Sequence, residues 1–239
     1  MTSNLNELTI ENADGPPRAL ADFSTQSADG QTRVYFRDIE QHLLAHINEA
    51  DIVVGSVAWL THETILDALA TKHGVAIVVQ KEDFLRPDIE APTDWKAHLR
   101  RRYSRLPTTL TRLDNGLMGT ILHMMSCCVD PTIDAVRCLG NSNVEKRPAS
   151  PRAHNKFVVF CRLTAPSAQG EFLAYEPYEV WTGSFNFTGN ATRSFENAVV
   201  IREPRIVRAY FEEFAQIEAL SEPLDWESNW VEPQWRIGT

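Results

Sequence analysis

Apolar residues recur along this chain with two spacings, which together predict alternating helices and strands. Phe36, Ile39, Leu43 and Ile47 recur at helical spacing, so an amphipathic helix is expected to end near residue 50. Similar patterns predict a buried strand over residues 52–59, a second helix that stops at residue 74, and a second buried strand over residues 75–80. A strand, helix and strand within about thirty residues form a βαβ unit. A parallel pair of strands covered by helices is therefore expected at the centre of a sheet.

The second half of the chain predicts further strands and a closing helix. Weak strand patterns cover residues 119–126 and 135–139, and clearer ones cover residues 156–162, 178–183 and 197–201. The strands at 156–162 and 178–183 are joined by a segment with Pro166 and Gly170 that is typical of a hairpin. A helix is expected over residues 94–106, and another over residues 203–220.

The two ends of the chain have a different composition. Residues 1–33 are rich in Asn, Asp, Ser and Thr without a sustained apolar period, which predicts a loose arm with at most a short strand. Trp226, Trp230 and Trp235 follow residue 221, and such tryptophans favour a tail that clamps onto the body, or else an oligomer contact. We thus expect an arm over residues 1–33, one domain over 34–220 and a tail over 221–239.

Neither a membrane span nor a secretion signal is expected in this chain. No stretch approaches about 18 uncharged apolar residues, and the first twenty residues are polar and acidic. The cysteines have no framework-like spacing, which favours reduced thiols and a cytoplasmic protein; they are Cys127, Cys128, Cys138 and Cys161. His123 with Cys127, Cys128 and Cys138 is the alternative, a zinc site, but its spacing matches no standard finger, so we expect no metal.

Charge is distributed unevenly over the 239 residues, whose net charge is −9. That average argues against a non-specific coat for nucleic acid or for an anionic membrane. Residues 96–162, however, hold twelve basic and four acidic residues, a net +8, and the remainder carries −17. The basic segment favours a local contact with a phosphate backbone. The candidate substrate-binding residues are Arg100, Arg101, Arg102 and Arg152, although a solvated helix face would also explain the run from 96 to 105.

Two short strings place reactive polar side chains at the ends of apolar strands. His154 and Lys156 open one strand and project to the same side of it, because residues two apart share a face. An imidazole is a competent nucleophile, and an ammonium beside it suits an anionic substrate. Ser184 and Asn186 share a face after another strand, and Gly183 allows a backbone amide to approach closely. These residues are candidates for an oxyanion pocket.

His154-x-Lys156, then Gly183-Ser184-x-Asn186, then Glu196, resembles the HKD signature of the phospholipase D superfamily, in its branch with one signature per chain. The resemblance covers roughly residues 34–220. It implies an α/β sandwich of six to eight strands, with a mixed, largely parallel sheet and helices on both faces. One position departs from the pattern, because Cys161 stands where the family has a supporting Asp.

The resemblance also implies a role for each residue and no cofactor. His154 would attack the phosphorus of a phosphodiester to give a phosphohistidine. Glu196 would accept a hydrogen bond from the other ring nitrogen, while Lys156, Ser184 and Asn186 hold the non-bridging oxygens. A single signature implies a symmetric homodimer in which the second His154 is the general acid. Six other histidines compete for that role without a matching polar set, namely His42, His46, His62, His73, His98 and His123.

The leading hypothesis is a metal-independent phosphodiesterase, specifically a nuclease acting on DNA or RNA. A phospholipid phosphodiesterase would use the same residues, but the sequence has no apolar lip or amphipathic anchor for a membrane. Cys161 leaves a third hypothesis open, a degenerate nucleic-acid-binding subunit that supports a helicase or another partner in a restriction or defence complex.

Overall fold

A nine-stranded sheet organises the residues that the computed structural model describes, which are 4–81, 94–115, 120–126, 133–140, 152–164, 172–173, 175–224 and 226. In spatial order its strands are β14 (Glu222–Pro223), β9 (Val136–Leu139), β6 (Gly74–Gln80), β5 (Ile52–Val57), β10 (Lys156–Leu163), β12 (Tyr175–Gly183), β13 (Ala198–Ile201), β4 (Thr32–Tyr35) and β3 (Thr25–Gln26). A smaller sheet contains β11 (Phe172–Leu173), β8 (Thr120–Ser126) and β7 (Leu110–Asn115).

The sheet is mixed, as predicted, but it is not largely parallel. Only the pairs β5–β6 and β6–β9 are parallel, and the other six pairs are antiparallel. A parallel neighbour needs a crossover of a dozen or more residues, usually a helix. Between β12 and β13 the chain has only the short 3₁₀ helix η2 (Ala191–Arg193), so these strands return antiparallel. The predicted βαβ unit is present as β5, the helix α2 (Glu63–Leu69) and β6.

Helices cover both faces of the sheet, as predicted. On one face α1 (Ile39–Glu49), α2 and α3 (Trp95–Tyr103) pack on a cluster that includes Val158, Phe160 and Trp181. On the other face α4 (Pro204–Ala219) inserts Val207, Phe211, Phe214 and Ile217 against Val159 and its neighbours. Each fully buried side chain of this size contributes about 1.5–3 kcal/mol. Every residue of β5 and β6 is buried, because both faces of these central strands are covered.

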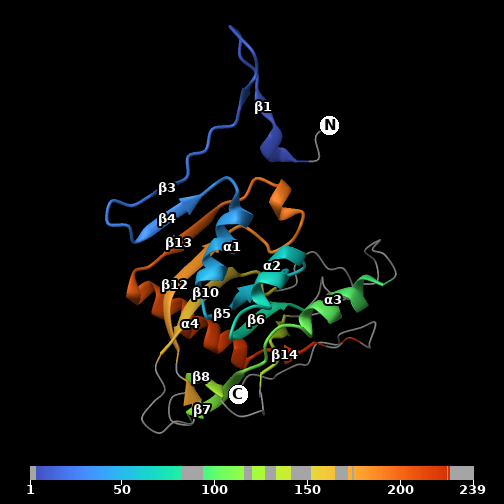
Figure 1. The fold of residues 1–239 in the computed structure, drawn as a ribbon, viewed down its shortest axis with the longest axis vertical. Helices are drawn as coiled ribbons and strands as arrows, with labels where there is room; N and C mark the ends of the chain where they lie inside the picture. Colours follow the sequence, from blue (N-terminus) through green and yellow to red (C-terminus); the bar gives the residue numbers. More distant parts are fainter. Residues whose placement is uncertain are drawn as a thin grey trace.

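The N-terminal arm has more regular structure than the sequence predicted. It contains the 3₁₀ helix η1 (Leu5–Glu7) and a hairpin of β1 (Thr9–Ile10) and β2 (Arg18–Ala19), and it reaches the main sheet through β3. The hairpin projects from the body of the molecule (Figure 1). The division into arm, domain and tail remains a proposal. In the tail, Trp226 packs edge-on against Tyr103, whereas Trp230 and Trp235 lie outside the described residues.

Candidate active site

The antiparallel strands bring the predicted site residues to one edge of the sheet. Lys156 opens β10 opposite Val57, which closes β5, and Phe157 pairs with Thr182 near the end of β12. Gly183 pairs with Ala198, the first residue of β13. The start of β10, the end of β12 and the start of β13 therefore lie side by side, and they carry His154, Lys156, Ser184, Asn186 and Glu196.

His154 and Lys156 are in direct contact. The Lys156 ammonium nitrogen lies 3.0 Å from His154 Nδ1 and 3.4 Å from Nε2. An ammonium only donates, so the ring nitrogen that accepts from it carries no proton. Burial lowers the pKa of the half-buried Lys156 below its usual value, and the carboxylate of Glu196 opposes that shift. The ring of Trp59 meets the exposed His154 edge-on, with a centroid distance of 5.9 Å.

Ser184 and Glu196 form the second half of the site. The Ser184 hydroxyl donates a short hydrogen bond to Glu196 Oε2 and accepts one from the Asn197 backbone N–H at 3.0 Å. Gly183 makes this approach feasible: its φ is +152°, and a Cβ there would lie 2.3 Å from the Asn197 carbonyl oxygen. Glu196 is thus hydrogen-bonded to Ser184, and the bond from His154 to Glu196 stays a prediction.

Asn186 has an unsatisfied amide beside these groups. Its Oδ1 atom is buried and has no hydrogen-bond partner among the described residues, although the residue is half-buried. Its turn is fixed, because the next carbonyl, Phe187 O, accepts from the backbone N–H groups of Thr61 and His62 after β5. An unpaired buried polar group costs about 1–3 kcal/mol. A donor group of a ligand could pair with this oxygen, and a ligand oxygen could accept from the amide nitrogen.

Gln80 is a site residue that the sequence analysis missed. It is 1% exposed at the end of β6, and its Oε1 accepts from the Ala153 backbone N–H at 2.6 Å, one residue before His154. Gly140 makes room for the Gln80 side chain, because a Cβ at residue 140 would lie 2.8 Å from Gln80 Oε1. The φ of Gly140 is +122°, a conformation that also favours glycine. Gln80 therefore fixes the segment that leads into His154. A buried glutamine closing an otherwise apolar strand was the available signal.

The candidate arginines differ in their surroundings. Arg102 on α3 makes ion pairs with two α2 carboxylates, Glu63 at 2.7 Å and Asp67 at 3.0 Å. Arg105 also pairs with Asp67, at 2.9 Å. These pairs balance part of the basic segment, so its positive charge is smaller in space than along the sequence. The side chains of Arg100 and Arg101 are exposed. Arg152 is exposed two residues before His154 and bridges Gly140 through its backbone.

Cys161 lies away from this edge. It is fully buried on the α4 face, in the cluster with Val159, Tyr175 and Phe211. Burial raises the pKa of its thiol well above the usual value, and Arg208 opposes the shift. The departure from the family pattern thus falls in the core, five residues along the strand from Lys156. Cys138 is also a buried thiol outside any disulfide, whereas Cys127 and Cys128 lie outside the described residues.

Several other histidines have partners within the fold. His46 is buried against Glu179, His62 lies 3.6 Å from Glu40, and His98 pairs with Glu63 at 2.9 Å. The side chain of His123 is not among those described. In the part of the chain that the structure describes, no three His, Cys, Asp or Glu side chains are grouped to hold a metal. Nor does that part contain a helix with the length and apolarity that a membrane crossing requires.

No family model matches the chain. It is, however, 30% identical over 233 residues to Uncharacterized protein L381 of Acanthamoeba polyphaga mimivirus, a match that covers 94% of this chain and 75% of the viral protein. The chain belongs to the family of this viral protein.

The fold of this L381-family chain resembles solved structures of low sequence identity. NucT from Helicobacter pylori gives a TM-score of 0.50 at 12% identity, over 81% of this chain and 98% of that one. Nuc, a phospholipase D family member from Salmonella typhimurium, gives a TM-score of 0.45 at 17% identity, over 80% of this chain and 95% of that one. The likeness to NucT confirms the predicted phospholipase D-like fold, and the chemistry has to be argued from the site.

Proposed function

We propose that this chain is a phosphodiesterase, and specifically a nuclease that cleaves DNA or RNA through a phosphohistidine at His154. The observation that carries the proposal is the contact between Lys156 and the His154 ring, at the same edge as the pair Ser184–Glu196. A nucleophile, a cation and a hydroxyl–carboxylate pair at one edge suit attack on an anionic diester.

Substrate binding would exchange the partners of these four residues. In the free site, Lys156 donates to His154 and Ser184 donates to Glu196. The non-bridging oxygens of a bound phosphodiester would accept from the Lys156 ammonium and the Ser184 hydroxyl instead. Once Lys156 releases His154, the exposed ring would exchange its proton from Nε2 to Nδ1 through solvent. Nδ1 would then donate to the released Glu196 carboxylate, and the unprotonated Nε2 would be free to attack. Hydrogen bonds of catalytic groups often reach their working geometry only in the complex.

The proposed reaction balances in two displacements. His154 Nε2 forms a bond to phosphorus, the bond to the leaving oxygen breaks, and the imidazolium of the second His154 in a homodimer protonates that oxygen. The same second His154, now neutral, then takes a proton from a water molecule that attacks phosphorus and breaks the P–N bond. Lys156 and Asn186 would supply the stabilisation of the phosphoryl charge that other enzymes obtain from a divalent metal.

Cleavage assays in EDTA test the proposal. Purified protein is incubated with single- and double-stranded DNA and with RNA, next to the variants His154→Ala and His73→Ala. His73 is an exposed histidine that precedes β6, at the opposite end of that strand from Gln80. We expect cleavage by the native protein and by His73→Ala, and at least a 10³-fold loss in His154→Ala. Quenching with detergent at alkaline pH after incubation with labelled substrate should trap a covalent adduct that acid later releases, and only when His154 is present.

Two other outcomes would replace this function. Release of phosphatidic acid from anionic vesicles, without cleavage of nucleic acid, would identify a phospholipid phosphodiesterase. Binding of nucleic acid that is unchanged in His154→Ala, with no turnover by the native protein, would identify a degenerate binding subunit, with a helicase or other defence component as its partner.

A further inference from the structure

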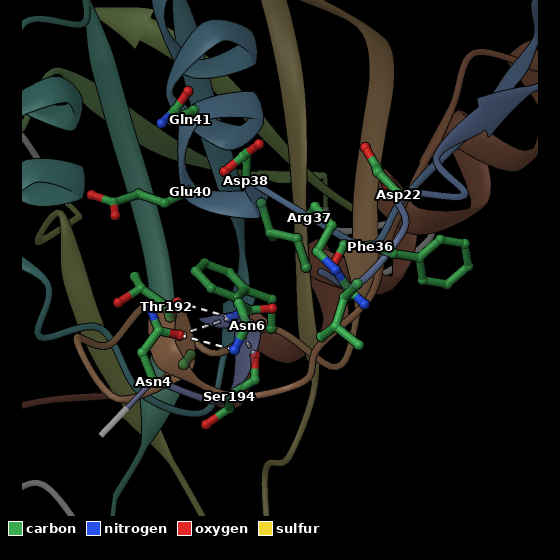
Figure 2. Close-up of a pocket in the computed structure, with 14 residues that line it drawn as sticks. Asn4, Asn6, Asp22, Phe36, Arg37, Asp38, Glu40, Gln41, Thr192 and Ser194 are labelled. Atoms are coloured by element: carbon green, nitrogen blue, oxygen red, sulfur yellow. Dashed lines mark hydrogen bonds between the residues drawn. The ribbon is translucent and has the colours of Figure 1, made fainter. Parts of the chain in front are cut away.

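A pocket of about 370 Å³ is lined in part by the segment between β12 and β13, which also carries Ser184, Asn186 and Glu196. Its walls are the N-terminal arm, the start of α1 and the segment that follows β12 (Figure 2). Small-molecule sites in proteins commonly measure about 300–1,000 Å³. The pocket is therefore large enough for a group of the size of a nucleobase.

The arm is fastened to the rim of this pocket by one amide. Asn6 Nδ2 donates to the backbone carbonyl of Ser194 at 3.2 Å and to that of Thr192 at 3.4 Å, as Figure 2 shows. Asn4 orients this amide, because its Oδ1 accepts from Asn6 Nδ2 at 3.3 Å and also from the Asn6 backbone N–H at 3.0 Å. The arm thus forms a wall of the pocket, which gives a binding role to a segment outside the catalytic signature.

The pocket is continuous with the candidate catalytic residues along the chain. Phe185, which lines it, stands between Ser184 and Asn186. Ser194, also in the lining, is two residues before Glu196. The pocket and the candidate catalytic residues therefore share one short segment of the chain.

The charges of the lining disfavour a second phosphate. The lining contains three carboxylates, those of Asp22, Asp38 and Glu40, and a single guanidinium, that of Arg37. Hydrogen bonds from Ser24 hold the pKa of Asp22 below its usual value, so this carboxylate is charged at neutral pH. Carboxylates accept hydrogen bonds from amino groups, and in nucleic acids they suit the exocyclic amine of cytosine.

Two groups in the lining have hydrogen-bonding capacity to spare. Arg37 Nε is buried and has no partner among the described residues, while its Nη1 donates to the Phe36 carbonyl at 2.8 Å. Asp38 precedes α1 with a left-handed φ of 50°, and its side chain does not cap the helix. A non-Gly residue in this conformation is uncommon and is often found at functional positions. A base carbonyl and a base amine would satisfy Arg37 and Asp38 respectively.

We propose that this pocket binds the nucleobase adjacent to the scissile phosphate and favours bases with an exocyclic amino group over thymine and uracil. The inference rests on the proposed nuclease function, which it deepens by naming a base preference. It also explains why the lining is acidic beside a site for an anion: the carboxylates would repel the backbone and leave the pocket to the base.

Cytosine and uracil make a matched pair of probes, because they have similar size and differ in the amine that the pocket would recognise. Cleavage of dC10 and dU10 is compared with that of bis(p-nitrophenyl) phosphate, a diester without a base. The test variant is Asp38→Asn, because asparagine tolerates a positive φ. The control variant is Gln216→Ala, an exposed residue of α4 outside the lining.

For the native protein we expect kcat/KM to be about tenfold higher for dC10 than for dU10, the effect of one good hydrogen bond to a charged group. Asp38→Asn should remove most of this ratio, and Gln216→Ala should keep it. Equal cleavage of dC10 and dU10 by the native protein, or the same ratio in both variants, would overturn the inference while the nuclease function stands.

If the native protein cleaves neither the oligonucleotides nor bis(p-nitrophenyl) phosphate, the proposed function fails, and calorimetric binding tests the pocket separately. Cytidine should bind more tightly than uridine to the native protein, and this difference should be lost in Asp38→Asn. Phosphoethanolamine binding in place of cytidine would overturn the base assignment, because it would identify an amine headgroup as the occupant.

Discussion

Lys156 is a half-buried cation whose protonation has to persist for the proposed chemistry. Burial lowers its pKa, so the ammonium loses its proton at a pH below the usual value of 10.5. The stabilisation that it would give to a phosphoryl oxygen is present while the ammonium keeps its proton and is lost as the pH rises through the lowered pKa. The alkaline side of a pH–rate profile should report this residue.

We therefore expect kcat/KM for oligonucleotide cleavage to fall with an alkaline limb below pH 10.5. Lys156→Arg should be less active, because a planar guanidinium replaces a compact ammonium, but its alkaline limb should move upward since arginine keeps its proton. Steady-state rates between pH 6 and pH 11 measure both effects. An identical alkaline limb in the two proteins would remove Lys156 from the explanation.

Gln80 acts on His154 only through the backbone. In Gln80→Leu the Ala153 N–H loses its acceptor, and we expect kcat to fall about tenfold with little change in KM, because the error lies in the position of the nucleophile rather than in binding. Gln80→Glu keeps an acceptor and should recover part of kcat. If kcat is unchanged in Gln80→Leu, the segment before His154 is held by other contacts.

At the level of elements, a buried polar network joins α1 to the far strands of the sheet. Glu179 in β12 accepts from Arg202 at 2.5 Å and lies 2.6 Å from His46 of α1. The Tyr35 hydroxyl in β4 completes it, 3.1 Å from the other nitrogen of His46. Burial alone would raise the pKa of Glu179, but its hydrogen bonds and charge interactions with His46 and Arg202 outweigh burial and lower it.

A carboxylate with a lowered pKa in the folded state stabilises the fold above its unfolded pKa, and the contribution is lost as the pH falls through the folded pKa. We expect Glu179→Gln to lower the free energy of unfolding by about 2 kcal/mol at pH 7 and to have a smaller effect near pH 3. Urea unfolding at pH 7, 5 and 3 measures the difference between variant and native protein. A difference that does not depend on pH would contradict the charged pair.

Local patterns predicted the elements well because their residues are close in sequence. The spacing of Ile39, Leu43 and Ile47 gave α1, and the apolar run at 75–80 gave β6. The order of strands was harder, since pairs such as β13–β4 and β14–β9 join residues far apart in the chain. For this reason the expectation of a largely parallel sheet was wrong, since six of the eight strand pairs are antiparallel.

The candidate site shows the same limit. The motif spacing predicted that His154 and Lys156 share a face, and their contact agrees with it. It could not predict that Gln80, more than seventy residues earlier, contacts Ala153 just before His154, because that contact depends on the position of β6. Nor could charge counting along the chain predict that Arg102 faces Glu63 and Asp67 of α2.

At the scale of the whole molecule, the proposed mechanism needs two copies of the chain. If the general acid comes from a second His154, a dimer of native protein and His154→Ala lacks either the nucleophile or the acid in every arrangement. A fixed amount of native protein is therefore mixed with a growing excess of His154→Ala until the subunits have exchanged, and activity should fall toward zero. Light scattering measures whether the mass is that of a dimer. Activity that stays constant would show that one chain suffices.

The ends of the large sheet bear on how such copies could meet. The outermost strands, β3 and β14, are two residues each, and β14 ends in Pro223, which has no N–H to offer a further strand. Short, interrupted edge strands are a recognised protection against uncontrolled strand-to-strand growth. Copies of this chain are thus discouraged from adding sheet to sheet into fibres. Association is directed to surfaces that close on themselves, which is the requirement for a finite assembly.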